Sequence, residues 1–300
     1  MHCEPRPRDK STAHKLIQFL RRGKRPGQAV LRRLLGEAAE PDLRARVAAT
    51  KELVGLEPSH ASHTYALNRV SDIVQELVDF PEMSPFIERL MASEEMYMPN
   101  GPPVSPLTRS YYTLWAFFDV PGGPFQETFG SIVLELGKAF GMAPDLLDAI
   151  ETLQRSRMGL YLHNGARGSV VTLEDLLTGT SQRVVVPAGY LGKRGELWFV
   201  RLLPPLYAED PNHIAMTTPY VIGRPDVHEW LEYFARNGIS GAGAEYERHL
   251  KYGPEASYWP EYVFEAYVNH RRDLIWLAGL PDIPESRPLS RVNQHWGTVH

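Results

Sequence analysis

The chain has 300 residues, of which 43% are hydrophobic and 23% are charged, and its formal net charge is −4. This balance is typical of a globular protein of about two domains, and it excludes a molecule whose whole surface is built to coat nucleic acid or an anionic membrane. The single cysteine, Cys3, excludes an internal disulfide and a zinc site with more than one sulfur ligand.

A reducing compartment fits this cysteine content, and arginine is strongly preferred over lysine. We therefore expect a bacterial cytoplasmic protein. No membrane partner is expected, because no apolar run approaches the roughly 18 residues that a spanning helix needs, and the polar, proline-containing N-terminus does not resemble a secretory signal.

Helical periodicity dominates the first 98 residues. Apolar residues at helical spacing, with glycine and proline at the ends of the runs, predict helices over residues 12–22, 27–36, from 41 onward, 65–80 and 84–95. The third of these has Leu43, Val47 and Val54 on one side. Residues 1–46 carry 12 Lys or Arg against 5 Asp or Glu, so we predict a basic N-terminal helical domain over residues 1–98.

Four prolines within residues 99–107 interrupt the helical pattern, since proline cannot continue a helix. After this break the spacing predicts three more helices, over residues 108–119, 124–140 and 144–157. Together they form a predicted helical segment over residues 108–158.

From residue 159 onward the period of the apolar residues changes from 3.6 to 2, which indicates strands. We predict a hairpin over residues 159–172 that turns at Asn164 and Gly165, then a short helical turn over 173–177. Further strands are predicted over 184–186, 197–203 and 213–222. The sequence thus predicts a small antiparallel β-module of three to five strands over residues 159–222.

The remaining chain returns to a helical pattern, with helices predicted over residues 226–236, 244–251 and 258–278. This C-terminal helical segment, residues 226–280, is rich in aromatic residues, and residues 281–300 are expected to form a tail. The predicted fold class is α+β and predominantly α-helical, with helical N-terminal and C-terminal parts around the β-module.

The β-module carries one resemblance to known proteins. The stretch VTLEDLLTGTSQRVVVP, followed by ELWFVRLLPP, resembles a small β-module of uncharacterised bacterial proteins, some of which also carry a cysteine-rich SEC-C metal-binding tail. The resemblance covers residues 171–203. It implies no activity and transfers no site residue.

The first candidate site is a cluster of cations around the first two predicted helices, formed by Arg21, Arg22, Lys24, Arg25, Arg32 and Arg33. Such a cluster is able to contact the phosphates of a nucleic acid or another anionic partner, with salt-dependent binding. The alternative is a solvated face of amphipathic helices.

The second candidate site is a set of His and Glu residues in the C-terminal helices. His228 and Glu232 are four residues apart, as are Glu245 and His249, so each pair lies on one side of a helix. The hypothesis is a metal ion held by these pairs, with Glu261 and Glu265 as a third pair; the alternative is surface ion pairs of small energy. His60 and His63, together with Glu57, form a further group of side chains that are able to bind one metal ion; the alternative is that the histidines are merely exposed in a polar loop.

The third candidate is a partner-binding surface on the β-module, formed by Lys193 and Arg194 in a turn and by Arg201 on a strand.

No nucleophile lies beside a base in the sequence, so no catalytic residue is assigned. We therefore expect a non-catalytic regulatory protein that binds another protein and needs no cofactor. The alternatives are nucleic-acid binding through the basic helices and a metal-dependent enzyme that uses the C-terminal His/Glu pairs.

Overall fold

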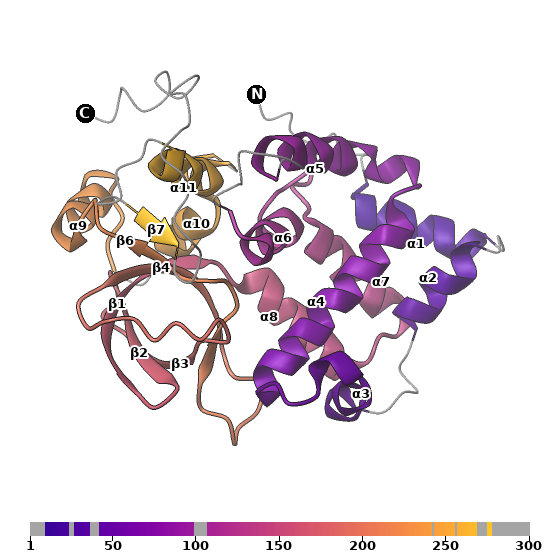
Figure 1. The fold of residues 1–300 in the computed structure, drawn as a ribbon. Helices are drawn as coiled ribbons and strands as arrows, with labels where there is room; N and C mark the ends of the chain where they lie inside the picture. Colours follow the sequence, from indigo (N-terminus) through magenta and orange to yellow (C-terminus); the bar gives the residue numbers. More distant parts are fainter. Residues whose placement is uncertain are drawn as a thin grey trace. The chain divides into compact units, whose positions relative to one another are not determined.

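The structure is a computed structural model, and it describes residues 10–23, 27–36, 42–98, 107–241, 243–255, 257–268 and 275–277. Within these residues the chain forms eleven α-helices and a seven-stranded sheet (Figure 1). The predicted α+β, predominantly helical class is confirmed. Cys3, Lys24, Arg25 and the predicted tail lie outside the described residues.

The chain divides into two compact units that alternate along the sequence. The first unit comprises Met1–Ala92, Thr113–Ser156 and Leu203–Ile214, and the second comprises Ser93–Tyr112, Arg157–Leu202 and Ala215–His300. The division of the chain into parts that end at residues 98, 158 and 222 stays a prediction.

The first unit is helical. Its elements are α1 (Thr12–Arg22), α2 (Gly27–Leu35), α3 (Leu43–Ala49), η1 (Lys51–Leu53), α4 (Pro58–Leu77), η2 (Pro81–Met83), most of α5 (Ser84–Tyr97), part of α6 (Arg109–Phe118), α7 (Phe129–Phe140) and α8 (Pro144–Arg155). Helices α4, α7 and α8 pack against one another, and α1, α2 and α3 pack against α4 or α7. Helix α1 has the predicted bounds, and the other predicted helices occur with shifted ends.

The longest helix, α4, begins earlier than predicted. Glu57 accepts hydrogen bonds from the backbone N–H groups of Ser59 and His60, and Pro58 occupies the first turn, which is a favourable arrangement for a helix start. Val54 was expected on the buried side of the preceding helix, but α3 ends at Ala49 and the side chain of Val54 is 68% exposed.

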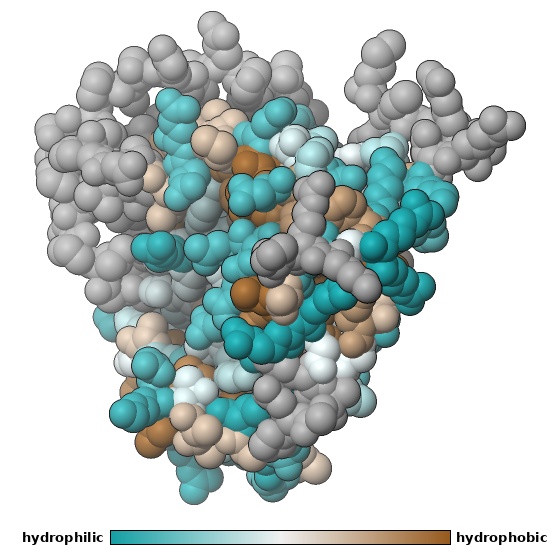
Figure 2. Space-filling model, turned by 90° about the vertical axis from the view of Figure 1, so that its right-hand side faces the viewer, coloured by the Kyte–Doolittle hydropathy of each residue, from teal (hydrophilic) through white to brown (hydrophobic). Residues whose placement is uncertain are grey.

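The apolar sides of α1 and α2 point inward. Leu16 and Leu20 of α1, and Leu31 and Leu35 of α2, are buried. Figure 2 views the molecule from the side on which Figure 1 labels these two helices, and that face is mostly hydrophilic, with small and separated hydrophobic areas. None of the described helices is long and apolar enough to cross a membrane.

The strands are β1 (Met158–Arg167), β2 (Val170–Asp175), β3 (Ser181–Val185), β4 (Leu197–Leu203), β5 (His213–Ala215), β6 (Tyr220–Ile222) and β7 (Ile275–Leu277). Their order is β1-β2-β3-β5-β4-β6-β7, and an additional β1–β4 pairing closes the first five into a barrel. The pairs β1–β2, β2–β3 and β1–β4 are antiparallel, so β5 must run parallel to one of its neighbours β3 and β4. The predicted simple antiparallel module is therefore wrong in this respect: the sheet is a mixed, closed barrel.

Alternating side chains fill the barrel. Val171 and Leu173 of β2, Val184 of β3, and Trp198 and Val200 of β4 belong to one buried cluster, as expected when residues two apart face the same side of a strand. The barrel interior is thus a packed core.

Two predicted features of the first hairpin are wrong. Strand β1 continues through Asn164 and Gly165 with a register shift, and the chain turns at Gly168, which has φ +63°. Residues 173–175, predicted as a helical turn, belong to β2. Asp175 ends this strand and accepts hydrogen bonds from the backbone N–H groups of Leu177 and Thr178, so it holds the TGTSQ turn as an Asx-type turn.

The C-terminal helices are α9 (Val227–Arg236), α10 (Ala244–Tyr252) and α11 (Tyr258–Val268). The last predicted helix was expected to continue to residue 278, but residues 275–277 form β7, which pairs with β6. The predicted strand over 213–222 is divided into β5 and β6.

Candidate functional site

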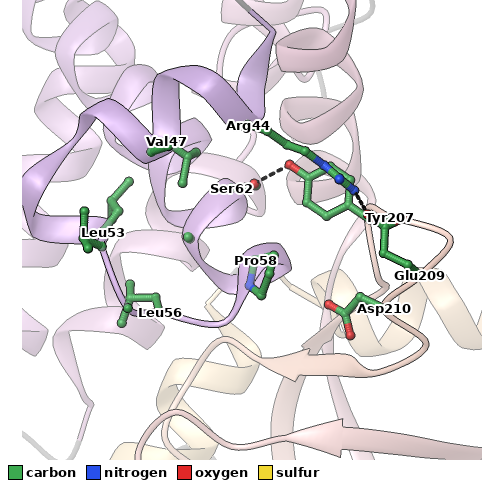
Figure 3. Close-up of a pocket in the computed structure, with 13 residues that line it drawn as sticks. Arg44, Val47, Leu53, Leu56, Pro58, Ser62, Tyr207, Glu209 and Asp210 are labelled. Carbon is green, nitrogen blue, oxygen red and sulfur yellow. Dashed lines mark hydrogen bonds and ion pairs between the residues drawn. The ribbon is translucent and has the colours of Figure 1, made fainter.

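A cleft of about 390 Å³ lies in the first unit between α3, η1, the start of α4 and residues 206–210 (Figure 3). We call it the α3–α4 cleft. Its two walls differ in chemistry: Figure 3 shows Val47, Leu53 and Leu56 on one side and Arg44, Tyr207, Glu209 and Asp210 on the other.

The apolar wall exposes large side chains to solvent. Val54 is 68% exposed and Leu56 is 39% exposed, and both line the cleft. Gly55 between them has φ +89°, a conformation that glycine adopts readily. This turn thus contributes two exposed apolar side chains to the lining of the cleft.

The polar wall is held in place by its own contacts. The guanidinium of Arg44 lies 3.8 Å from the centre of the Tyr207 ring and forms an ion pair with Glu209. The Tyr207 hydroxyl shares a 2.6 Å hydrogen bond with the Ser62 hydroxyl of α4. The positive charge of Arg44 is therefore already matched within the wall.

Two carboxyl groups meet at the edge of this wall. Glu57 and Asp210 share a side-chain hydrogen bond, which requires one proton between them. Burial raises the pKa of Glu57 to about 7, and the bond to Asp210 acts in the same direction. Burial acts to raise the pKa of Asp210, but the hydrogen bonds from Glu57 and from the Ser59 hydroxyl (2.8 Å) outweigh this effect and lower it. The negative charge of the pair therefore resides on Asp210, which lines the cleft.

The two histidines next to the cleft serve the fold. His63 is fully buried, and its Nε2 lies 3.0 Å from the carbonyl oxygen of Pro204; burial lowers its pKa to about 4. Burial also lowers the pKa of His60. Among the described residues no group of three or more His, Cys, Asp or Glu side chains is arranged to hold a metal ion, so the structure does not bring Glu57, His60 and His63 together as a metal site.

Two serine hydroxyls of α4 at the cleft hold residues of the chain together. Both are buried and engaged: Ser59 donates to Asp210, and Ser62 pairs with Tyr207. These two hydrogen bonds connect α4 to residues 207–210. The cleft offers an apolar wall, an aromatic ring and an unmatched carboxylate.

The described basic residues of the N-terminal cluster differ in exposure. Arg21, Arg22 and Arg33 are exposed. Arg32 is half-buried and donates to the carbonyl oxygens of Leu20 and Gly23, so its guanidinium caps the end of α1.

The C-terminal His/Glu pairs do not form one site. The side chain of His228 is 82% exposed and forms a surface ion pair with Glu232 at 3.2 Å. His249 is buried beside aromatic rings, with its Nε2 3.0 Å from the Tyr233 hydroxyl, while Glu245 is exposed. Burial lowers the pKa of His249. Glu261 accepts a hydrogen bond from Tyr97, and the side chain of Glu265 is outside what the structure describes.

The predicted partner surface of the β-module is only partly at the surface. Lys193 and Arg194 are exposed in the loop before β4. Arg201 is 0% exposed, so it does not lie on a surface with them. The loop is anchored by His163, whose Nε2 lies 2.8 Å from the carbonyl oxygen of Leu191, and by Glu196, which accepts from Tyr190 and Trp198.

The α3–α4 cleft was not predicted from the sequence. Its walls come from residues 44–62 and 207–210, which no local pattern connects. Comparison with protein-family models, with curated proteins and with solved structures gave no match, so the resemblance of residues 171–203 to a SEC-C-associated module stays a prediction.

Proposed function

We propose that this protein is a non-catalytic binding protein whose α3–α4 cleft holds a short segment of another protein, in which an apolar residue lies next to Lys or Arg. The observation that carries the proposal is the pairing of two unlike walls: exposed Val54 and Leu56 line the same cleft as a fixed polar wall that ends in Asp210.

Charge favours a basic ligand. Arg44 and Glu209 neutralise each other across their ion pair, which leaves Asp210 as the unmatched charge of the cleft. Because Lys and Arg carry long aliphatic stems, such a side chain is able to cover the apolar wall while its cationic end reaches Asp210.

The size of the cleft favours side chains over a large cofactor. Its volume of about 390 Å³ is near the lower end of the range of about 300–1,000 Å³ that is typical of ligand pockets. One or two side chains of a peptide fill such a space, and their loss of freedom on binding is small compared with that of a long segment.

Selection from a displayed peptide library tests this proposal. We expect the wild-type protein to enrich peptides with an apolar residue beside Lys or Arg. Val54→Asp adds a charge to the apolar wall and Asp210→Asn removes the unmatched carboxylate, so each is expected to weaken a selected peptide by about tenfold, which corresponds to about 1.4 kcal/mol. The matched control is Asp72→Asn, an exposed position on α4 outside the cleft.

Two results would contradict the proposal. One is the absence of any enriched sequence. The other is an acidic consensus whose binding is lost in Lys193→Glu/Arg194→Glu and kept in the cleft variants, because that result assigns binding to the basic loop before β4.

A further inference from the structure

A second cavity, of about 280 Å³, lies in the other unit between α9 and α11. We call it the aromatic pocket. Its lining includes Pro225 and the rings of Trp230, Tyr233, Tyr258 and Tyr262. The Trp230 ring centre is 5.5 Å from those of Tyr233 and Tyr262, at interplanar angles of 85° and 76°. The pocket wall is thus made of aromatic faces and edges at nearly right angles.

The aromatic wall is fixed by contacts behind it. The Tyr233 hydroxyl lies 3.0 Å from both the Tyr258 hydroxyl and the Nε2 of His249. The indole N–H of Trp259 donates to the backbone oxygen of His249 at 2.9 Å. These bonds hold α9, α10 and α11 together, so the shape of the pocket exists before any ligand arrives, which lowers the entropy cost of binding.

One wall residue has an unused donor. Trp230 is 3% exposed, and its Nε1 has no acceptor among the described residues. Buried donors in proteins are nearly always paired. A ligand carbonyl oxygen that reaches this ring would supply the missing acceptor.

The rim of the pocket is charged and mostly acidic. Glu229, Glu232 and Arg236 line it and are exposed. Glu229 also accepts from the backbone N–H of Asp226 at 2.7 Å, and Glu232 faces both His228 and Arg236. Two carboxylates against one guanidinium favour a ligand with a cation outside its apolar part.

We infer that the aromatic pocket binds a proline-rich segment of a partner protein, in the polyproline II conformation, with Arg or Lys beside the prolines. Proline rings pack on aromatic faces, and a polyproline II backbone presents carbonyl oxygens that have no internal partner. Proline has no backbone N–H group, so its binding requires no hydrogen-bond acceptor in the pocket wall. This site is separate from the α3–α4 cleft and does not depend on the function proposed for it.

A small alkylammonium ion is the other ligand that aromatic rings and carboxylates attract. The structure favours the proline-rich ligand over it, because the buried Nε1 donor of Trp230 lacks an acceptor within the described part of the chain and an alkylammonium ion has none to offer. The test includes this ion as a competitor.

Fluorescence anisotropy with a labelled peptide of Pro-Pro-Leu repeats and one terminal Arg tests the inference on the full chain. We expect saturable binding, and loss of binding when the prolines of the peptide become Ala at equal charge. Trp230→Phe keeps the ring and removes the Nε1 donor, and it is expected to weaken binding about tenfold. Glu232→Gln is expected to weaken binding of the Arg-bearing peptide and to leave a peptide without Arg unaffected, whereas Glu245→Gln, an exposed position outside the pocket, changes neither.

Circular dichroism of each variant checks that the fold is kept, and Tyr258→Phe offers a second variant if Trp230→Phe fails to fold. Equal binding of the proline and alanine peptides would overturn the inference, as would full competition by tetramethylammonium. Binding that increases when Pro281, Pro284 and Pro288 of the full chain are changed to Ala would also overturn it, because the chain's own prolines would then be the occupant.

Discussion

Glu57 combines two roles that conflict at neutral pH. Its carboxylate accepts two backbone N–H groups at the start of α4, where the helix dipole favours negative charge. Burial and the neighbouring Asp210 nevertheless raise its pKa to about 7. The unfolded value is about 4.5, so the folded state takes up a proton at this position between these two pH values.

The sign of the resulting pH dependence follows from linkage. A carboxyl whose pKa is raised on folding stabilises the folded state fully below about pH 4.5, and this contribution is lost as pH rises through about 7. We expect the free energy of unfolding of the wild type to fall by about 1 kcal/mol relative to Glu57→Gln over this range, a value reduced for partial solvent exposure. Urea unfolding of both proteins at a series of pH values measures it.

The comparison with Glu57→Gln isolates this group from the neighbouring histidines. Burial lowers the pKa of His60 and His63, so their contribution is present above about pH 6.5 and is lost as pH falls, which is the opposite sign. It occurs in both proteins and cancels in the difference. A difference that does not change between pH 4.5 and 7 would contradict the raised pKa of Glu57.

Asp175 is the carboxylate on which the TGTSQ turn depends. One oxygen accepts from the backbone of Leu177 and Thr178 and from the Tyr246 hydroxyl, and the other lies 3.5 Å from the Arg157 guanidinium. Asp175→Ala removes the acceptor of the Tyr246 hydroxyl and of two backbone N–H groups, while Arg157 keeps its ion pair with Glu247. We therefore expect a loss of about 1–3 kcal/mol in the free energy of unfolding. Chemical denaturation followed by circular dichroism measures it.

Asp175→Asn separates the turn from the charge, since an amide oxygen still accepts from the turn. Its loss is expected to be smaller than that of Asp175→Ala. Arg183→Ala, an exposed position on the facing strand β3, is expected to change the free energy of unfolding by less than about 0.5 kcal/mol. Equal effects of the Asp175 and Arg183 variants would show that the turn does not depend on Asp175.

Among the elements, the α1–α2 pair depends on one arginine. Arg32 of α2 donates to the carbonyl oxygens of Leu20 and Gly23 at the end of α1, where the helix leaves carbonyl groups without intrahelical partners. The neighbouring Arg33 is exposed. Adjacent residues of the same type thus have different roles.

We expect Arg32→Ala to lower the free energy of unfolding by about 1–3 kcal/mol, the range for hydrogen bonds to a charged group, and Arg33→Ala to leave it nearly unchanged. Hydrogen exchange of the α1 amides is expected to increase only in Arg32→Ala. If a nucleic acid binds this pair of helices, Arg33→Ala weakens that binding instead and reduces its salt dependence. Identical stabilities of the two variants would contradict the capping role of Arg32.

The sequence predicts elements well where the apolar period is long and clear. The bounds of α1 and β4 follow directly from it, because Leu16 and Leu20, and Trp198 and Val200, repeat at the helical and strand periods. Prediction from the sequence fails where pairing between strands determines where an element begins or ends. Asn164 and Gly165 suggest a turn, yet pairing with β2 carries β1 beyond them, and β7 forms because it pairs with β6.

At the scale of the whole molecule, binding surfaces depend on segments far apart in sequence. The α3–α4 cleft needs Tyr207 and Asp210 beside Ser62 and Ser59, and no sequence period joins these positions. Exposed Val54 was the available signal, but helical spacing placed it in the core. The C-terminal His/Glu pairs show the reverse: regular spacing placed His249 on a helix face, and that face is buried against aromatic rings.

The first unit is expected to be incomplete without its last segment. Leu203–Ile214 supplies the acceptor for His63 and the partners of Ser59 and Ser62. A fragment that ends at Ser156 lacks all of them. We therefore expect faster hydrogen exchange over residues 58–63 of α4 in this fragment than in the full chain, because buried polar groups lose their partners.

A synthetic peptide of residues 203–214, added in excess, is expected to restore part of this protection, while a peptide of the same composition in scrambled order restores none. Equal exchange rates over residues 58–63 in the fragment and the full chain would contradict the dependence of α4 on Leu203–Ile214.

The alternation of the two units along the chain also sets an order of events during synthesis on the ribosome. A nascent chain exposes α4 long before residue 214 leaves the exit tunnel. Ser59, Ser62 and His63 therefore lack their hydrogen-bond partners while β1–β4 are translated. Domains usually fold as they emerge, the N-terminal one first. Here the first unit is complete only after residue 214 has emerged, and the second only after its last segment, Ala215–His300, has followed. Until then, incomplete parts of both units are accessible to chaperones and proteases.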